Sequence, residues 1–246
     1  MITHEQKTLS KTKPHPENLP PVPERPPGSH PVLNLSELNA ESPGTTIKTI
    51  LTELSNHTTT DSSENWELLL VNRTHKIPAH YSVTLTELSN GKKVGQRIYP
   101  SLQQMFDDAR AAGLSLFVRE GYRTAENQQQ IMDERITKYE NQGYSKTEAT
   151  KLAEEYVAIP GTSEHQLGLS VDINADTTKC SSEKVYQWLD ENAWKYGFIK
   201  RYPSDKTDIT GISNEPWHYR YVGKDAAKTM KEENLCLEEY LEQYKK

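Results

Sequence analysis

Residues 163–172 read Ser-Glu-His-Gln-Leu-Gly-Leu-Ser-Val-Asp, a loop-forming segment that runs into an apolar one. Leu169, Val171 and Ile173 alternate with small or polar residues, and a period of two predicts a β-strand with its aliphatic side chains on one face. Asp172 falls on the opposite face of that strand. A carboxylate there needs a partner if it is to be buried, so the polar face of the strand is the predicted functional site.

A metal ion is the partner that we predict. His165 precedes the strand, Asp172 lies on it, and His218 follows in the later segment Glu-Pro-Trp-His. Two neutral imidazoles and one carboxylate suit zinc and leave a fourth position open, which is typical of catalytic zinc sites. Glu215 precedes a proline and is therefore expected to be extended. A bend at Pro216 would bring His218 to the metal and the Glu215 carboxylate to the metal-bound water as a proton carrier.

Each of these residues also has a purely structural interpretation. A single histidine in a loop is more often a hydrogen-bonding residue than a ligand, and Asp172 could be a salt-bridge carboxylate. Glu215 could pair with Arg220 or Lys200. Trp217 could be an ordinary core aromatic instead of a cleft wall. Only the joint pattern favours the metal site.

Composition excludes several other classes. The chain has 246 residues, a formal net charge of -6 and no Lys/Arg-rich run, which argues against an electrostatic grip on nucleic acid. Its longest aliphatic run, 68–71, is far shorter than the roughly 20 residues of a membrane span. Cys180 and Cys236 are too few for a disulfide framework and lack the spacing of a structural zinc site, so one optional bridge is the most they could form.

The chain divides into two parts by composition. Nine of its fourteen prolines lie between Pro14 and Pro43, and 48–63 is dominated by Thr, Ser and Asn. Such a segment has little apolar surface to offset the entropy of ordering, so residues 1–64 are predicted to form a disordered tether, with a short helix over 47–54 as an open alternative. Residues 65–246 are the predicted folded domain.

The predicted elements of that domain indicate an α+β fold. Short strands are separated by helices without regular alternation, which favours a small, mostly antiparallel sheet flanked by helices. The expected strands are 66–71, before a turn at Pro78, and 114–118, 168–173, 198–202 and 218–222. The expected helices are 101–112 capped by Ser101 and ended by Gly113, one starting after Thr124, one behind a capping box at Ser145–Glu148, and 182–196, 224–233 and 237–244.

The complete set of motifs resembles the zinc D-Ala-D-Ala carboxypeptidases of the VanY type, which share a fold group with lysostaphin-type peptidases and the hedgehog signalling domain. The family signature is SxHxxGxAxD followed by EPWH, and the resemblance extends from about Trp66 to Leu241. The first motif corresponds to Ser163, His165, Gly168, Ser170 and Asp172, and the second lies within 215–220. Further segments that resemble the family are 121–124 with Gln128, 159–162, 196–198, 201–202 and 237–241.

The resemblance implies roles for individual residues. His165, Asp172 and His218 would be the ligands of one zinc ion, and Glu215 the general base and acid. Arg123 would face the substrate and bind its C-terminal carboxylate or the carbonyl oxygen on which charge develops.

Three further residues are weaker candidates for substrate binding. Ser163 would hold the same end of the substrate as Arg123, Gln128 would line the pocket, and Trp217 would form its wall. Loop hydrogen bonding is the alternative for Ser163, and an exposed helix face is the alternative for Gln128. For Arg123 the alternative is an ion pair with Glu120 or Glu126 at the start of a helix. Position 170 is Ser where the family pattern has Ala, and position 120 is Glu where relatives commonly carry Ser, which leaves specificity open.

The implied activity is removal of the C-terminal D-Ala from peptidoglycan stem peptides ending in D-Ala-D-Ala, the chemistry of vancomycin resistance. An L,D-carboxypeptidase on tetrapeptides and a D,D-dipeptidase are alternatives, as is an inactive zinc-bearing wall-binding module. The expected location is extracytoplasmic, with the protein tethered to the cell wall or membrane and its targeting segment absent from this chain. A cytoplasmic location is the alternative.

Overall fold

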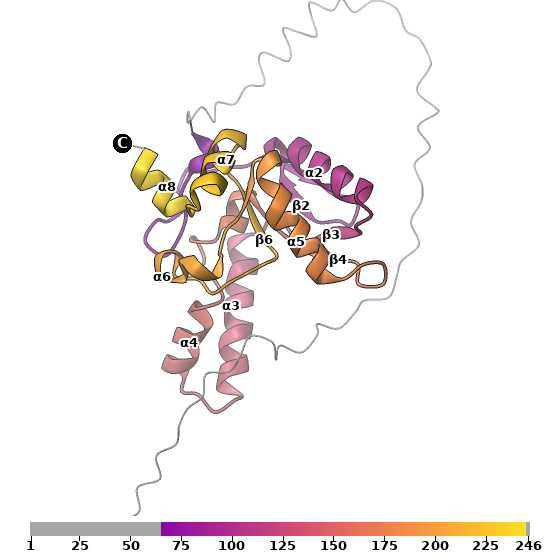
Figure 1. Ribbon diagram of the computed structural model, residues 1–246. Coiled ribbons are helices and arrows are strands. Elements are labelled where there is room, and N and C mark those ends of the chain that lie inside the picture. The colour runs from indigo at the N-terminus through magenta and orange to yellow at the C-terminus, as the bar shows by residue number, and fades with distance from the viewer. Residues whose placement is uncertain (1–64, 245–246) are drawn as a thin grey trace, which may run out of the picture. The chain divides into compact units, whose positions relative to one another are not determined.

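A computed structural model describes residues 65–244, and all statements about structure concern this range. The predicted tether and the alternative helix over 47–54 lie outside the described residues. The described domain is built on an antiparallel sheet with the strand order β3-β4-β6-β5 (Figure 1), which confirms the predicted α+β class. Its strands are β3 (Leu116–Glu120), β4 (Ser170–Ala175), β6 (His218–Tyr221) and β5 (Phe198–Lys200).

The two faces of the sheet differ in character because of the register of β4 and β6. Val171 pairs with Tyr219, and both side chains enter the apolar core. Asp172 pairs with His218 one position further, so these two polar residues share the opposite face. Across the other edge of β4, Glu120 pairs with Asp172 after an irregularity in β3.

Helices cover the apolar face and the ends of the sheet. α2 (Tyr99–Ala111) and α5 (Ser182–Asn192) contribute to the main core together with residues of β3 and β4. α7 (Lys224–Glu233) and α8 (Leu237–Tyr244) enclose a second apolar cluster around Ile199 and Val222. The termini of both final helices coincide with the predicted ones.

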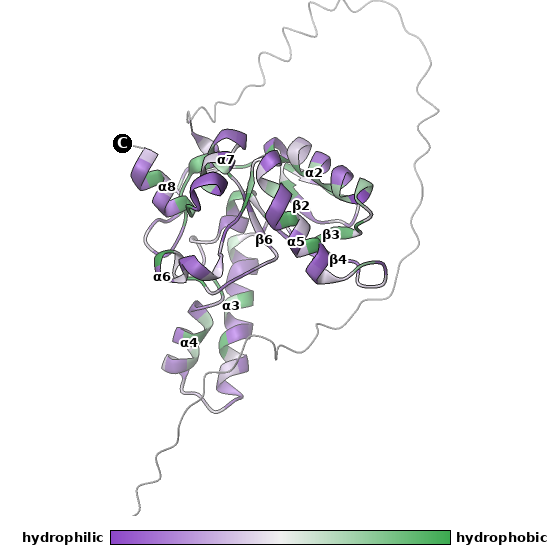
Figure 2. Cartoon of the chain, in the orientation of Figure 1, coloured by the Kyte–Doolittle hydropathy of each residue, from purple (hydrophilic) through white to green (hydrophobic). Residues whose placement is uncertain are grey.

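A helical hairpin extends away from the sheet. It consists of α3 (Ala125–Glu140) and α4 (Lys146–Glu154), which meet at a small cluster around Met132 and Ala153 (Figure 1). Figure 2 shows α3 coloured mostly as hydrophilic, in line with a helix that buries only a narrow stripe. As predicted, Thr124 caps α3 and Ser145 forms a capping box with Glu148.

Several predicted elements differ from the structure. The helix predicted over 182–196 ends as α5 at Asn192 and continues as a 3-10 turn, η5 (Ala193–Tyr196), and the strand predicted over 168–173 is shifted by two residues in β4. The apolar run at 66–71 is a 3-10 turn, η2 (Trp66–Leu68), followed by irregular chain rather than a strand. The carbonyl oxygens of Glu67 and Leu69 each accept a hydrogen bond of 2.9 Å from the Arg220 guanidinium, so a side chain satisfies backbone groups that a strand would have paired.

Two further differences surround α2. The helix begins at Tyr99 with Pro100 in its first turn, so Ser101 is not the N-cap. It still ends before Gly113, whose φ is +81°. β3 starts two residues later than predicted, because the amide of Leu114 donates to the carbonyl of Ala109 at the helix end.

Both cysteines are free thiols. Cys180 Sγ donates to the Ser115 carbonyl at 3.2 Å, and Cys236 is buried. Burial raises the pKa of the Cys236 thiol to about 11. Within 65–244, no helix combines the length and the apolar character needed to cross a membrane.

A small hairpin fixes the segment before α3. It is formed by β1 (Leu85–Glu87) and β2 (Lys93–Gly95), which were not predicted. The Lys93 carbonyl accepts from the amide of Tyr122 at 2.6 Å, and the Gly95 amide donates to the Gly168 carbonyl at 2.9 Å. The hairpin therefore connects the turn at Gly121 with the segment that enters β4.

Gly121→Ala tests this close approach. An added Cβ would lie 2.2 Å from the Lys93 carbonyl oxygen, so the hairpin and the turn must separate. We expect the free energy of unfolding to fall by about 1–3 kcal/mol in urea denaturation followed by circular dichroism. Ser89→Ala, at an exposed position in the turn between β1 and β2, is the control and should change the free energy of unfolding by less than about 0.5 kcal/mol. Parent-like stability of Gly121→Ala would contradict the packing.

Candidate metal centre

His165 is oriented by the turn at Gly121. It lies in a 3-10 turn, η4 (Glu164–Leu167), which ends at Gly168 with a φ of +69°. Its Nδ1 atom lies 2.7 Å from the Gly121 carbonyl oxygen, to which it must donate because a carbonyl only accepts. The lone pair is therefore on Nε2, which faces β4.

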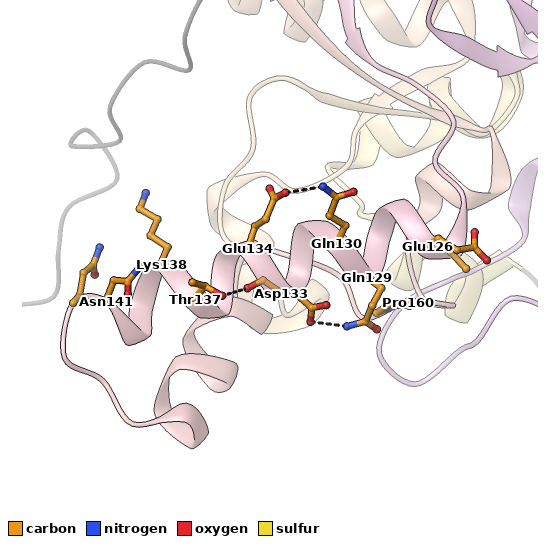
Figure 3. A pocket seen from close by; sticks show the side chains of 11 residues that line it. Glu126, Gln129, Gln130, Asp133, Glu134, Thr137, Lys138, Asn141 and Pro160 are labelled. Atoms are coloured by element: carbon orange, nitrogen blue, oxygen red, sulfur yellow. Dashed lines mark hydrogen bonds between the residues drawn. The ribbon is translucent and has the colours of Figure 1, made fainter.

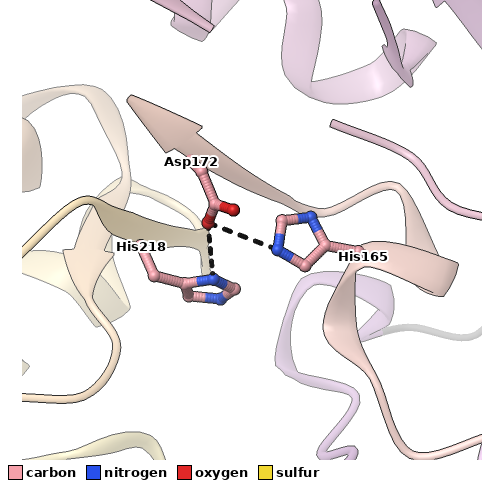
Figure 4. A group of neighbouring side chains, drawn as sticks. All are labelled: His165, Asp172 and His218. Atoms are coloured by element: carbon pink, nitrogen blue, oxygen red, sulfur yellow. Dashed lines mark hydrogen bonds and ion pairs between the residues drawn. The ribbon is translucent and has the colours of Figure 1, made fainter. Parts of the chain in front are cut away.

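Asp172 is the centre of the group in Figure 4. Its Oδ1 atom lies 3.3 Å from His165 Nε2 and 3.0 Å from His218 Nδ1. One potential ligand atom from each of these three residues lies within 4.8 Å of the others. The two imidazole rings are 4.8 Å apart and nearly perpendicular. Both histidines are buried and Asp172 is nearly buried, and the candidate ligand atoms of all three side chains lie close together.

This donor set fits zinc. Two imidazole nitrogens and one carboxylate oxygen leave room for a fourth ligand in a tetrahedral arrangement. Burial and the nearby Arg123 lower the pKa of His165, which favours the neutral form that binds metal. Burial opposes ionisation of Asp172, but the two histidines outweigh it and hold its pKa well below the usual value.

His218 shows that the position attracts positive charge. Burial lowers its pKa, but hydrogen bonding to Asp172 and Glu164 more than reverses this effect and raises the pKa to about 9. A divalent cation at Nδ1 would be attracted to Asp172 in the same way as a proton on this ring nitrogen.

Glu215 stands beside the three potential ligands. A turn at 216–217 returns the chain, and the His218 amide donates to the Glu215 carbonyl at 3.3 Å. The Glu215 Oε2 atom lies 3.8 Å from His218 Nδ1. Burial raises the pKa of this carboxyl to about 7, with His218 opposing the shift and Asp172 adding to it. Such a carboxyl can exchange protons near neutral pH.

Arg123 is close to the same carboxylate. Its Nη2 atom lies 3.3 Å from Asp172 Oδ2, and its Nη1 atom donates to Gln128 Oε1 at 3.3 Å. Its Nε atom is buried and has no hydrogen-bond partner among the described residues; Glu120 Oε2 is 3.9 Å away. Gln128 is buried rather than on an exposed helix face, and it donates to the Ala158 carbonyl at 2.8 Å.

The remaining predicted residues lie near these elements. Ser163 is buried immediately before η4. Trp217 is half-buried in the turn after Glu215, and its carbonyl accepts from the amide of Ile173 at 2.9 Å. Neither side chain belongs to the group of potential metal ligands, so their roles stay predictions.

Sequence reasoning missed Glu164. The residue is 2% exposed, and its Oε1 atom accepts from Arg201 Nε at 2.8 Å and from Arg220 Nη1 at 3.0 Å. Its Oε2 atom lies 3.5 Å from His218 Nε2. Arg220 was considered as a partner of Glu215, but it pairs with Glu164. The available signal was the presence of one arginine in β6 and another directly after β5, since a buried guanidinium group requires a buried carboxylate.

A groove lies on α3, away from the candidate metal centre. It runs along α3 from Glu126 and Pro160 to Asn141 (Figure 3). Its polar side chains are paired with each other along the helix, as in Gln129 with Asp133 at 2.9 Å. None of the potential metal ligands lines this groove, so the chemistry is not located there.

Comparison with known proteins gives consistent matches. The family model described as VanY, D-alanyl-D-alanine carboxypeptidase, matches residues 91–224. A D-alanyl-D-alanine carboxypeptidase of Enterococcus faecalis is 57% identical over 178 residues, which is 72% of this chain. The match spans 66% of that relative, slightly less than two thirds of its length.

Two solved structures are similar in fold and sequence. VanYB in complex with D-alanine-D-alanine is 57% identical, with a TM-score of 0.72 and coverage of 73% of this chain and 99% of that one. A mutant of the vancomycin resistance D,D-pentapeptidase VanY from a VanB-type cassette, in complex with Zn(II), is 58% identical, with a TM-score of 0.70. Coverage there is 72% of this chain and 99% of the other.

Zinc content after dialysis tests the ligand set. We expect the parent protein to retain about one zinc ion per chain and His165→Ala or Asp172→Ala to retain almost none, because two protein ligands hold zinc poorly. Inductively coupled plasma mass spectrometry measures the ratio. His80→Ala, which changes an exposed histidine outside the group, should keep the parent value. Full retention by either ligand variant would contradict the assignment.

Proposed function

The chain belongs to the VanY family of D-alanyl-D-alanine carboxypeptidases, and on this basis we propose that it removes the C-terminal D-Ala from peptidoglycan stem peptides ending in D-Ala-D-Ala. The observation that carries the proposal is the convergence of His165, Asp172 and His218 beside Glu215. These three residues would hold one zinc ion. When bound, zinc supplies a Lewis acid and lowers the pKa of a coordinated water toward 7.

Glu215 is the proposed proton carrier. Its Oε2 atom takes the proton of the attacking water and later delivers it to the nitrogen of the departing D-Ala. Two features support this role: the carboxyl lies 3.8 Å from His218 Nδ1, and its pKa is raised to about 7 by burial. A carboxyl with that pKa is able both to accept and to return a proton at neutral pH.

Arg123 is the residue proposed to bind the C-terminus of the peptide substrate. Its two hydrogen bonds within the protein are long, at 3.3 Å, and its buried Nε donor lacks a partner among the described residues. A substrate carboxylate or carbonyl oxygen would satisfy this donor. Gln128 would orient the guanidinium of Arg123 through the hydrogen bond that its Oε1 atom accepts. Ser163 and Trp217 are proposed to contact the same end of the substrate.

Glu120 is the residue from which a specificity difference is expected. It faces Arg123 at 3.9 Å and pairs with Lys92 at 3.2 Å. A carboxylate here restrains the arginine and places negative charge near the substrate terminus. This charge is expected to affect which substrate is preferred among the pentapeptide, the tetrapeptide and the free dipeptide. We propose that the pentapeptide is preferred.

The substrate also determines the proposed location. Peptidoglycan stem peptides in the wall are reached outside the cytoplasm, so we propose an extracytoplasmic enzyme attached to wall or membrane. Residues 1–64 would serve as the tether of the catalytic domain over 65–246. A purely zinc-bearing binding module is the alternative of another class, and the position of Glu215 argues against it.

A substrate panel tests the proposed activity. Purified protein is incubated with a muramyl pentapeptide ending in D-Ala-D-Ala, the corresponding tetrapeptide and free D-Ala-D-Ala, and released D-Ala is measured. We expect release mainly from the pentapeptide, loss of activity with a chelator and recovery with added zinc. Faster cleavage of the tetrapeptide or dipeptide would change the substrate assignment, and no release from any of them would favour the binding module.

Glu215→Ala tests the role of the proton carrier. We expect kcat on the pentapeptide to fall by about 100- to 10,000-fold, the usual contribution of general acid–base catalysis, with zinc content unchanged. Glu134→Ala, an exposed glutamate on α3, is the matched control and should keep the parent kcat. A parent-like kcat in Glu215→Ala would remove Glu215 from the mechanism.

A further inference from the structure

Four charged side chains form a buried ionic cluster on the far side of His218 from Asp172. The cluster consists of Glu164, Arg201, Arg220 and Glu238. Arg201 donates Nε to Glu164 Oε1 at 2.8 Å and donates its two terminal nitrogens to the Glu238 carboxylate at 2.8 and 2.7 Å. Arg220 donates Nη1 to the same Glu164 oxygen at 3.0 Å. Two carboxylates therefore balance two guanidinium groups.

Such a cluster is costly to bury. The side chains of Glu164, Arg201 and Arg220 are all 0% exposed. Removing charges from water costs several kcal/mol per ion, and apolar residues of similar volume often stabilise a fold equally well. Simple stability is therefore a weak reason for its presence, and the position of its inner end suggests another role.

That inner end contacts a proposed zinc ligand. Both arginines bind Oε1 of Glu164, which leaves Oε2 directed at His218 Nε2, 3.5 Å away. The other ring nitrogen, Nδ1, faces Asp172 Oδ1 at 3.0 Å. Both ring nitrogens therefore face carboxylate oxygens, which only accept. If Nδ1 binds a metal ion, the neutral ring carries its hydrogen on Nε2, where Glu164 can accept it.

We propose that Glu164 is the positioning residue of the zinc site: it accepts the Nε2 hydrogen of His218 and thereby commits Nδ1 to the metal. Glu164 touches neither substrate nor metal and acts only through His218. A histidine whose second nitrogen is held by a carboxylate has a fixed tautomer and ring orientation, and loss of such a partner typically costs about 10- to 100-fold in metal affinity.

The two arginines hold the Glu164 carboxylate in a fixed position. Arg220 also donates to the carbonyl oxygens of Glu67 and Leu69 at 2.9 Å, and Arg201 is tied through Glu238 to α8. Segments from both ends of the described chain therefore fix one carboxylate. Their pairing also neutralises its charge, so Glu164 orients His218 without adding net negative charge next to the zinc.

Zinc affinity of three variants tests the proposal, which rests on the proposed zinc site but not on the substrate. Each dissociation constant is measured by competition with a chromophoric chelator, and folding of each apo-protein is checked by circular dichroism and thermal unfolding. Binding of zinc by the parent establishes the site itself. Failure of the positioning role is thus distinguishable from failure of the site or of the activity.

Glu164→Gln removes the charge but keeps the shape, and Glu164→Asp keeps the charge for the arginines while withdrawing from His218. We expect each to bind zinc about 10- to 100-fold more weakly than the parent, with kcat recovered substantially at saturating zinc. Glu164→Asp keeps the experiment decisive if Glu164→Gln does not fold, because it retains the buried negative charge beside the two arginines.

Glu238→Gln is the matched control. It breaks the outer pair with Arg201, and no contact joins it to His218. We expect a lower unfolding temperature with a zinc dissociation constant close to that of the parent. Parent-like zinc binding by a folded Glu164→Asp would overturn the proposal. So would an equal loss of affinity in Glu238→Gln, which would indicate a purely structural cluster.

Discussion

The pairing of β4 with β6 is the constraint on which the site depends. In this register Asp172 lies opposite His218, while Val171 lies opposite Tyr219 in the core. Side chains alternate between the faces of a strand, so a slip of one residue would bury the aspartate in the apolar core and turn the valine outward. The burial of the aliphatic residues therefore holds two potential ligands in place. The metal site depends on the same hydrophobic energy that forms the domain.

His165 is fixed by a different device. It comes from a short turn outside the sheet, and its ring orientation depends on one carbonyl, that of Gly121. That carbonyl is held in turn by the β1–β2 hairpin, whose Lys93 oxygen leaves no space for a side chain at position 121. Two potential ligands are thus positioned by the sheet, and the third is positioned by the turn and hairpin at its edge.

The sequence allowed the fold class and most helix termini to be predicted, because capping residues and glycines mark them locally. The residues of the candidate site could also be chosen, since a strand carboxylate and two histidines have few joint explanations. Glu164 could not be chosen, because its partners Arg201 and Arg220 are 37 and 56 positions away. The run at 66–71 has the length and composition of a strand, and only the distant Arg220 guanidinium explains why its carbonyls are not in a ladder.

The distribution of charge around His218 explains why two carboxylates can flank one ligand without neutralising the metal. Asp172 contributes its charge directly, as a potential ligand. The charge of Glu164 is offset by two guanidinium groups that bind its other oxygen. Three protein ligands then carry a single negative charge, so a bound zinc ion would keep a net charge of +1 and its electrophilic character. A second uncompensated carboxylate would hold His218 equally well but would weaken the cation as a Lewis acid. The buried arginines therefore separate the orienting role of Glu164 from its electrostatic effect.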